Sequence, residues 1–123
     1  MKALILSTQL LAAIYNPASR FINTNWVSKV SNKYVESINL RGGNYAVHYD
    51  KKSAQTFRGY YSVSKDTLII KERDDSRGIA SYHKIKLVLK GHELHYFSNE
   101  ELLNHQWTKS KVQADKNRVF TRI

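Results

Sequence analysis

The chain has 123 residues, of which 41% are hydrophobic and 24% charged, a composition typical of one globular domain with a modest core. It contains no cysteine, which excludes a disulfide framework and a cysteine metal site. Twenty basic side chains against ten acidic ones give a formal charge of +10, and such a surface attracts anions, including phosphates, anionic lipid and nucleic acid. The same excess of positive charge also serves solubility alone.

Residues 1–19 differ in character from the rest of the chain. Lys2 is their only charge before an apolar stretch from Ala3 to Ile14, which is the layout of a secretory signal peptide. The stretch is too short to span a bilayer, and it lacks an Ala-x-Ala cleavage site. The alternative is an N-terminal helix packed against the domain. A cleaved signal would place the protein in the periplasm or outside the cell, and a retained segment would leave it in the cytoplasm.

Residues 22–123 form the predicted domain. Strand-forming runs alternate there with turn signals every eight to twelve residues, which predicts an all-β barrel or sandwich. Trp26 lies on the first predicted strand, residues 25–30. On the next, residues 34–40, Glu36 shares its face with apolar residues and is expected to point inward.

The middle of the chain continues the alternating pattern. After a glycine-rich turn, Tyr45 and Tyr49 share one face of a strand, and we expect that face to be interior. Tyr61 is expected to be inward on the following strand, with Gly59 on the same face. A glycine inside a strand marks a bend or a close backbone approach, as barrel closure requires. Residues 64–66 then form a hairpin loop.

The last third contains three further features. His83 shares its face with a row of aliphatic residues and should point to the interior or its mouth, and Tyr96 points inward on the next strand. Residues 99–104 are expected to form a short helical turn, because their acidic side chains suit a helix N-terminus. Residues 106–112 and 118–123 are predicted to be closing strands, which makes eight or nine short antiparallel strands.

This order of features resembles the small bacterial lipocalin-like domains. The resemblance covers residues 24–123 and rests on a pair of short strand motifs, G-x-Y-x-[IV] followed by D-x-L-x-[IV]. The matching residues are Gly59, Tyr61, Val63, Asp66, Leu68 and Ile70. It implies an antiparallel up-and-down β-barrel of about eight strands with a cup-shaped interior, and it does not identify a ligand.

One departure from that family lies on the first strand. Lipocalins commonly carry Gly-x-Trp there, and this chain has Thr24 in place of the glycine two residues before Trp26. The family often stacks a basic residue from late in the barrel on that tryptophan. The resemblance makes Arg122 the candidate for this structural role, with Lys109 or Arg118 as alternatives.

Catalytic and metal-binding motifs are weak. His92 and His95 are three residues apart in a strand pattern, so they point to opposite faces and do not match a zinc-protease helix. The chain has no nucleophile elbow and no phosphate loop. The acidic residues near Glu72 are interpreted as part of a solvated loop. The sequence therefore predicts a protein that is not an enzyme and that needs no metal or cofactor.

The interior aromatic residues suggest that the barrel has a pocket for a small apolar or amphipathic molecule. Because the surface is basic, this molecule could also be anionic. The predicted lining is Glu36, Tyr45, Tyr49, Tyr61, His83 and Tyr96. Glu36 and His83 either pair with a partner inside the barrel or lie at strand ends in solvent. The alternative function is a basic interaction module that binds an acidic protein or single-stranded nucleic acid, with outward Tyr60 and Tyr82 as stacking platforms.

Overall fold

The structure, a computed structural model, describes residues 20–31, 34–50, 55–75, 78–110 and 118–123. The predicted signal segment, residues 1–19, lies outside the described residues. One 3-10 turn, η2 (Gly42–Asn44), precedes the third strand. The strands are β1 (Thr24–Ser31), β2 (Tyr34–Leu40), β3 (Tyr45–Asp50), β4 (Gln55–Ser64), β5 (Thr67–Asp74), β6 (Ser81–Lys90), β7 (Glu93–Leu103), β8 (Gln106–Lys109) and β9 (Val119–Arg122). No helix in the described part of the chain has the length and apolarity needed to cross a membrane.

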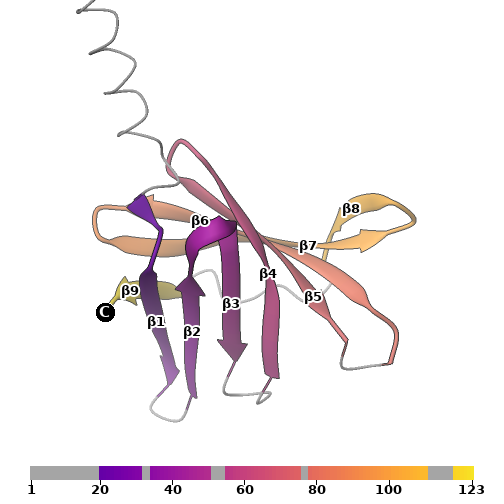
Figure 1. Cartoon of the computed structure of the whole chain (residues 1–123), viewed down its shortest axis with the longest axis horizontal. Helices are drawn as coiled ribbons and strands as arrows, with labels where there is room; N and C mark the ends of the chain where they lie inside the picture. Colours follow the sequence, from indigo (N-terminus) through magenta and orange to yellow (C-terminus); the bar gives the residue numbers. More distant parts are fainter. Residues whose placement is uncertain (1–19, 32–33, 51–54, 76–77, 111–117) are drawn as a thin grey trace, which may run out of the picture.

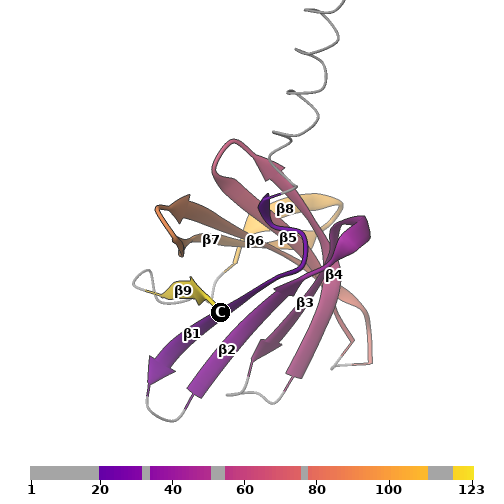
Figure 2. The same ribbon diagram turned by 60° about the vertical axis from the view of Figure 1, so that its left-hand side comes forward.

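The strands form a closed antiparallel barrel, which confirms the predicted fold class (Figures 1 and 2). Strands β1 to β7 pair in chain order, and β9 pairs with both β7 and β1 to complete a ring of eight. Strand β8 stays outside the ring, because it forms a hairpin with the far end of β7. The chain therefore runs up and down around the barrel, with one crossover at its end.

The helical turn predicted at residues 99–104 is wrong. Strand β7 continues to Leu103 and turns into β8 through Asn104 and His105, whose φ angles of 49° and 62° suit a two-residue hairpin. The acidic residues that suggested a helix N-terminus pair across strands instead. Glu100 lies opposite Lys84 of β6, and their charged groups are 3.6 Å apart.

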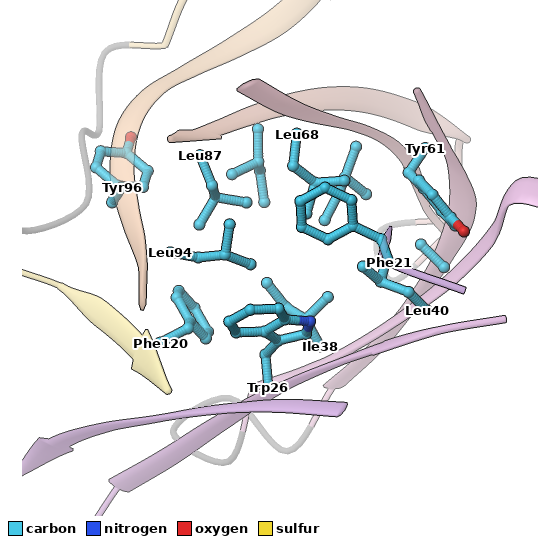
Figure 3. Packing of buried hydrophobic residues seen from close by; sticks show 13 residues of the cluster. Phe21, Trp26, Ile38, Leu40, Tyr61, Leu68, Leu87, Leu94, Tyr96 and Phe120 are labelled. Atoms are coloured by element: carbon cyan, nitrogen blue, oxygen red, sulfur yellow. The ribbon is translucent and has the colours of Figure 1, made fainter. Parts of the chain in front are cut away.

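The apolar core fills one end of the barrel (Figure 3). Its members alternate along the strands with outward residues, as a period of two requires. They are Phe21, Trp26, Ile38, Leu40, Ala46, Tyr61, Leu68, Ile70, Ile85, Leu87, Leu94, Tyr96 and Phe120. Burial of this cluster removes these apolar side chains from water. A depression of about 300 Å³ remains at its margin, beside Phe21, Trp26 and Leu89.

Trp26 belongs to this filled end. It is 3% exposed, its ring centroid lies 6.2 Å from that of Phe21, and its indole N–H donates to the Thr24 hydroxyl at 2.8 Å. Thr24 is thus the hydrogen-bond acceptor for the tryptophan. Arg122 is the cross-strand partner of Trp26 and is exposed. The cation–aromatic contacts among the described residues place Arg118, not Arg122, over aromatic rings, those of Tyr96 and Phe120.

Gly59 lies where two strands approach closely. A Cβ atom at this position would be 1.9 Å from the carbonyl oxygen of Lys71 and 2.7 Å from the Cα of Glu72, both on β5. No real side chain tolerates such distances, so β5 crosses β4 this closely only because residue 59 is a glycine. The close backbone approach expected from the sequence is present.

Candidate binding cavity at the polar end of the barrel

The interior changes from apolar to polar along the barrel axis. On β1 and β2 the pair Trp26 and Ile38 is followed by the pair Ser28 and Glu36, all four of them buried. Beyond this change lies a cavity of about 230 Å³. Its lining comes from six strands and residue 118, and consists of Glu36, His48, Asp50, Phe57, Glu72, Asp74, His83, Ile85, Tyr96, Asn99 and Arg118.

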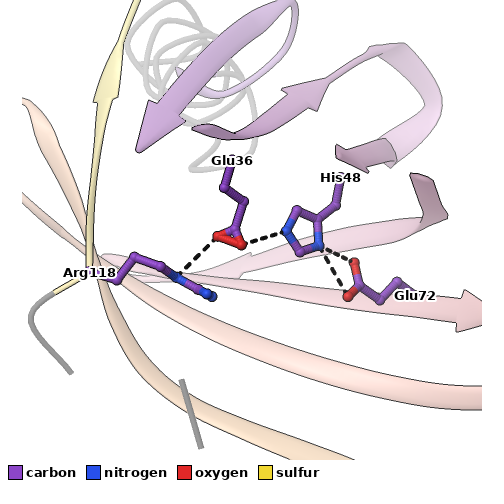
Figure 4. A network of polar contacts seen from close by, with 4 residues as sticks. All are labelled: Glu36, His48, Glu72 and Arg118. Atoms are coloured by element: carbon purple, nitrogen blue, oxygen red, sulfur yellow. Dashed lines mark hydrogen bonds and ion pairs between the residues drawn. The ribbon is translucent and has the colours of Figure 1, made fainter. Parts of the chain in front are cut away.

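Four charged side chains form a continuous network in its wall (Figure 4). The Arg118 Nε lies 3.1 Å from one carboxylate oxygen of Glu36, and the other oxygen lies 3.1 Å from the His48 Nε2. The opposite ring nitrogen of His48, Nδ1, lies 2.9 Å from Glu72. Glu36, His48 and Glu72 are each at most 5% exposed. Two carboxylates and two cationic groups therefore alternate inside the barrel, which is what buried charges require.

The carboxylates on both sides of His48 favour its protonated form. A neutral imidazole has one N–H donor and one acceptor nitrogen, whereas both nitrogens of His48 face carboxylate oxygens, which only accept. Burial alone would lower the pKa of His48, but the charges and hydrogen bonds of Glu72 and Glu36 outweigh it and raise the pKa to about 10. His48 is therefore an imidazolium at neutral pH.

Small residues allow the network to span non-adjacent strands. His48 is on β3 and Glu72 on β5, with β4 between them. Glu72 is in register with Gly59 on β4, which is in register with Ala46 on β3. Since Gly59 has no side chain and Ala46 only a methyl group, the inner face is open between Glu72 and His48. Gly59 thus permits both the close strand approach and the buried ion pair.

The predicted lining residues divide into three groups. Glu36, His83 and Tyr96 line the cavity. Tyr61 is buried, but it belongs to the filled end, where its hydroxyl donates to the Arg41 carbonyl at 3.4 Å. The interior position predicted for the remaining two residues, Tyr45 and Tyr49, is wrong.

Strand β3 has the opposite parity from the one predicted. Ala46 and His48 are buried, while Tyr45 is half-buried and Tyr49 is 37% exposed. Tyr45 instead meets Tyr60 of β4 edge-to-face, with ring centroids 6.0 Å apart. Cross-strand contact between aromatic rings covers enough area to hold tyrosines on an outer face.

Sequence reasoning missed His48, Glu72 and Arg118. A signal was present for Glu72, which has the same parity as buried Leu68 and Ile70 on one continuous strand. The inward position of His48 could not be read from the hydrophobic pattern of β3. Its outward residues, Tyr45 and Tyr49, are more hydrophobic than the inward positions beside them. Arg118 was considered only as a residue that stacks on the tryptophan.

The site combines an apolar wall with a polar one. Phe57, Ile85 and Tyr96 supply apolar surface, and the phenyl ring of Phe57 lies 5.6 Å from the imidazole ring of His48. The described residues contain no group of three or more His, Asp or Glu side chains arranged to hold a metal ion. Both nitrogens of His48 lie beside carboxylate oxygens, and in its imidazolium form neither nitrogen has a lone pair to act as a general base or as a metal ligand.

The chain was compared with models of protein families, with curated proteins and with solved structures, and nothing matched it.

Proposed function

We propose that the protein is a non-enzymatic, lipocalin-like binding barrel that holds a small amphipathic molecule in the cavity at its polar end. The observation that carries this proposal is the coexistence of an apolar wall with a buried charged network around one interior cavity of about 230 Å³. Binding sites for small molecules have this character, since apolar surface supplies affinity and a few fixed polar groups orient the guest.

The size of the cavity limits the guest. Pockets for drug-sized molecules measure about 300–1,000 Å³, and an apolar cavity of about 150 Å³ holds benzene. A cavity of about 230 Å³ lies between these values and suits a molecule built on one ring. A long fatty acid exceeds this volume, and the apolar core occupies the opposite end of the barrel, so most of its chain would have to lie outside the cavity.

The charge of the lining limits the guest further. Four carboxylates, from Glu36, Asp50, Glu72 and Asp74, surround the cavity against the cationic Arg118 and His48. Arg118 and His48 already face the carboxylates of Glu36 and Glu72, so their positive charge is balanced before a guest enters. An anionic guest would add a buried charge that this network does not balance. The proposed guest is therefore neutral or cationic at its polar end, although the protein as a whole is basic. Secretion to the periplasm or beyond, through residues 1–19, belongs to the same proposal.

The test uses three probes that share one ring and differ in charge: phenethylamine, 2-phenylethanol and phenylacetate. Isothermal titration should show binding of the amine and the alcohol, with phenylacetate weakest. Ile85→Phe, which adds volume at the cavity wall, should reduce binding at least tenfold, because the ring of the probe would compete for the same space. Ile79→Phe is the matched control, since Ile79 is 82% exposed.

Two results would contradict the proposal. One is that none of the three probes binds at millimolar concentration. The other is that Ile85→Phe and Ile79→Phe bind the probes as the wild type does, which would locate binding outside the cavity. Backbone amide shifts that move at His83 and Tyr96, and not at the filled end, would support it directly.

A further inference from the structure

The barrel separates its charges between inside and outside. Four of the ten acidic side chains line the cavity, together with Arg118. The other residues of the sequence carry 19 basic against 6 acidic side chains, so their excess of positive charge is larger than the +10 of the whole chain. A field of this sign draws polyanions to the surface.

One part of the outer surface combines these cations with tyrosines. It lies on β3 to β6, which are adjacent strands (Figure 1). Two neighbouring cross-strand rows run across it. In the first, Tyr45 is in register with Tyr60, and Tyr60 with Lys71. In the second, Arg58 is in register with Arg73, and Arg73 with Tyr82. We call these residues the aromatic–basic face: Tyr45, Arg58, Tyr60, Lys71, Arg73 and Tyr82.

The aromatic–basic face forms a groove and not a flat patch. All six residues line one surface depression of about 460 Å³, whose lining also includes Gly59 and Glu72. Tyr60 is 65% exposed and Tyr82 is 43% exposed, so their rings are open to solvent on at least one side. Because residue 59 has no side chain, the strands draw together there between the two rows.

We propose that the aromatic–basic face binds single-stranded nucleic acid. Proteins that bind single strands combine a cationic groove, which follows the phosphates, with exposed rings on which successive bases stack. Here Arg58 and Lys71 supply charges, and Tyr60 and Tyr82 supply exposed rings. Arg73 adds a third cationic group, a guanidinium that Asp75 holds through a contact of 2.8 Å to its Nε. The site lies outside the barrel and does not depend on the cavity being a binding site.

The chemistry of this face favours a single strand over other polyanions. Duplex DNA and heparin offer charge without accessible ring faces, and would leave the tyrosines unused. An anionic membrane would be contacted by aliphatic and aromatic side chains at the tip of a loop, whereas these tyrosines lie in a groove on the barrel wall between cations. Only unpaired bases use both the rings and the charges.

The experiment measures fluorescence anisotropy of labelled 12-mers of oligothymidylate and oligouridylate titrated with the full chain. Tyr60→Leu should weaken binding roughly 5- to 100-fold, while Tyr60→Phe, which keeps the ring, should stay near wild type. The matched control is Phe97→Leu, since Phe97 is 64% exposed on β7 and belongs to neither row. Lys71→Gln should lower the slope of log K against log salt by about 0.7.

The outcomes separate the alternatives. Loss of binding in Tyr60→Leu but not in Phe97→Leu supports the proposal. If Tyr60→Leu binds both oligonucleotides as the wild type does, the tyrosines form no stacking platform and the proposal is wrong. If heparin or vesicles of phosphatidylglycerol compete as well as unlabelled oligothymidylate, a diffuse positive field holds all polyanions and the proposal is likewise overturned.

Discussion

Replacing His48 by leucine removes the imidazolium between two buried carboxylates. Glu36 keeps its contact with Arg118 at 3.1 Å, whereas Glu72 loses the His48 nitrogen at 2.9 Å and stays buried. Removal of one partner from a buried ion pair costs about 3–5 kcal/mol, because the remaining charge has lost both water and its counter-ion. We expect His48→Leu to lower the free energy of unfolding by that amount at pH 7.

The wild type and this variant should also differ in how stability depends on pH. The pKa of His48 rises from 6.5 in the unfolded chain to about 10 in the folded one, so the folded state binds the proton more tightly. The stabilisation that protonated His48 gives to the folded state is complete below pH 6.5. Above pH 6.5 this stabilisation falls by about 1.4 kcal/mol per pH unit, and it is lost above pH 10. Over that range the linked loss is at most about 5 kcal/mol. His48→Leu lacks this decline.

The assay is urea unfolding between pH 6 and pH 9.5, followed by fluorescence of the buried Trp26. His92→Leu is the matched control, since His92 is exposed on the hairpin between β6 and β7. The difference in unfolding free energy between the wild type and His48→Leu should shrink as the pH rises, and that between the wild type and His92→Leu should not. A difference that is constant with pH, or a His48 ring that titrates near pH 6.5 by NMR, would refute the argument.

Two further predictions concern the barrel framework. Gly59→Ala places a methyl group against the Lys71 carbonyl oxygen and should lower the free energy of unfolding by about 3 kcal/mol or more, measured by chemical denaturation. Gly42→Ala is the control and should have little effect, because no atom lies within 4 Å of a Cβ placed there. Equal stability of the two variants would contradict the close approach of β4 and β5. Trp26 should fluoresce at short wavelength and resist iodide quenching when measured in a Trp107→Phe background, and ready quenching would contradict its burial at 3% exposure.

Much of the fold could be predicted from the sequence, because strand periodicity and turn chemistry are local properties. The alternation that placed Glu36, Tyr61 and Tyr96 inward is visible within single strands, and all three are buried. The glycine at position 59 indicated a close backbone approach, which the structure contains. Each of these inferences needs only the residue and its neighbours along the chain.

The candidate site was harder to predict from the sequence, because it depends on which strands lie next to each other. Glu72 is an ordinary solvated residue until β4 brings it opposite the gap at Gly59, and only then can it reach His48. Glu100 resembled a helix-capping residue because its lysine partner, Lys84, lies on another strand. Contacts between strands are non-local, and no pattern within a strand reveals them.

The charged network also has a consequence for how β3 pairs with its neighbours. Tyr45 and Tyr49 would bury more apolar area than Ala46 and His48, the residues of β3 that point inward. Hydrophobicity alone therefore favours a shift of the β3 pairing by one residue, which moves every side chain of the strand to the opposite face. After such a shift His48 would lie outside. Glu36 would keep Arg118, but Glu72 would remain inside without its partner, at a cost of several kcal/mol for that uncompensated charge.

The network therefore selects one register among those that the apolar residues allow. Replacing Glu36, His48 and Glu72 together by leucine should leave a compact barrel in which β3 adopts more than one pairing, visible as doubled amide peaks along β2, β3 and β4. A single set of peaks would mean that packing alone fixes the register.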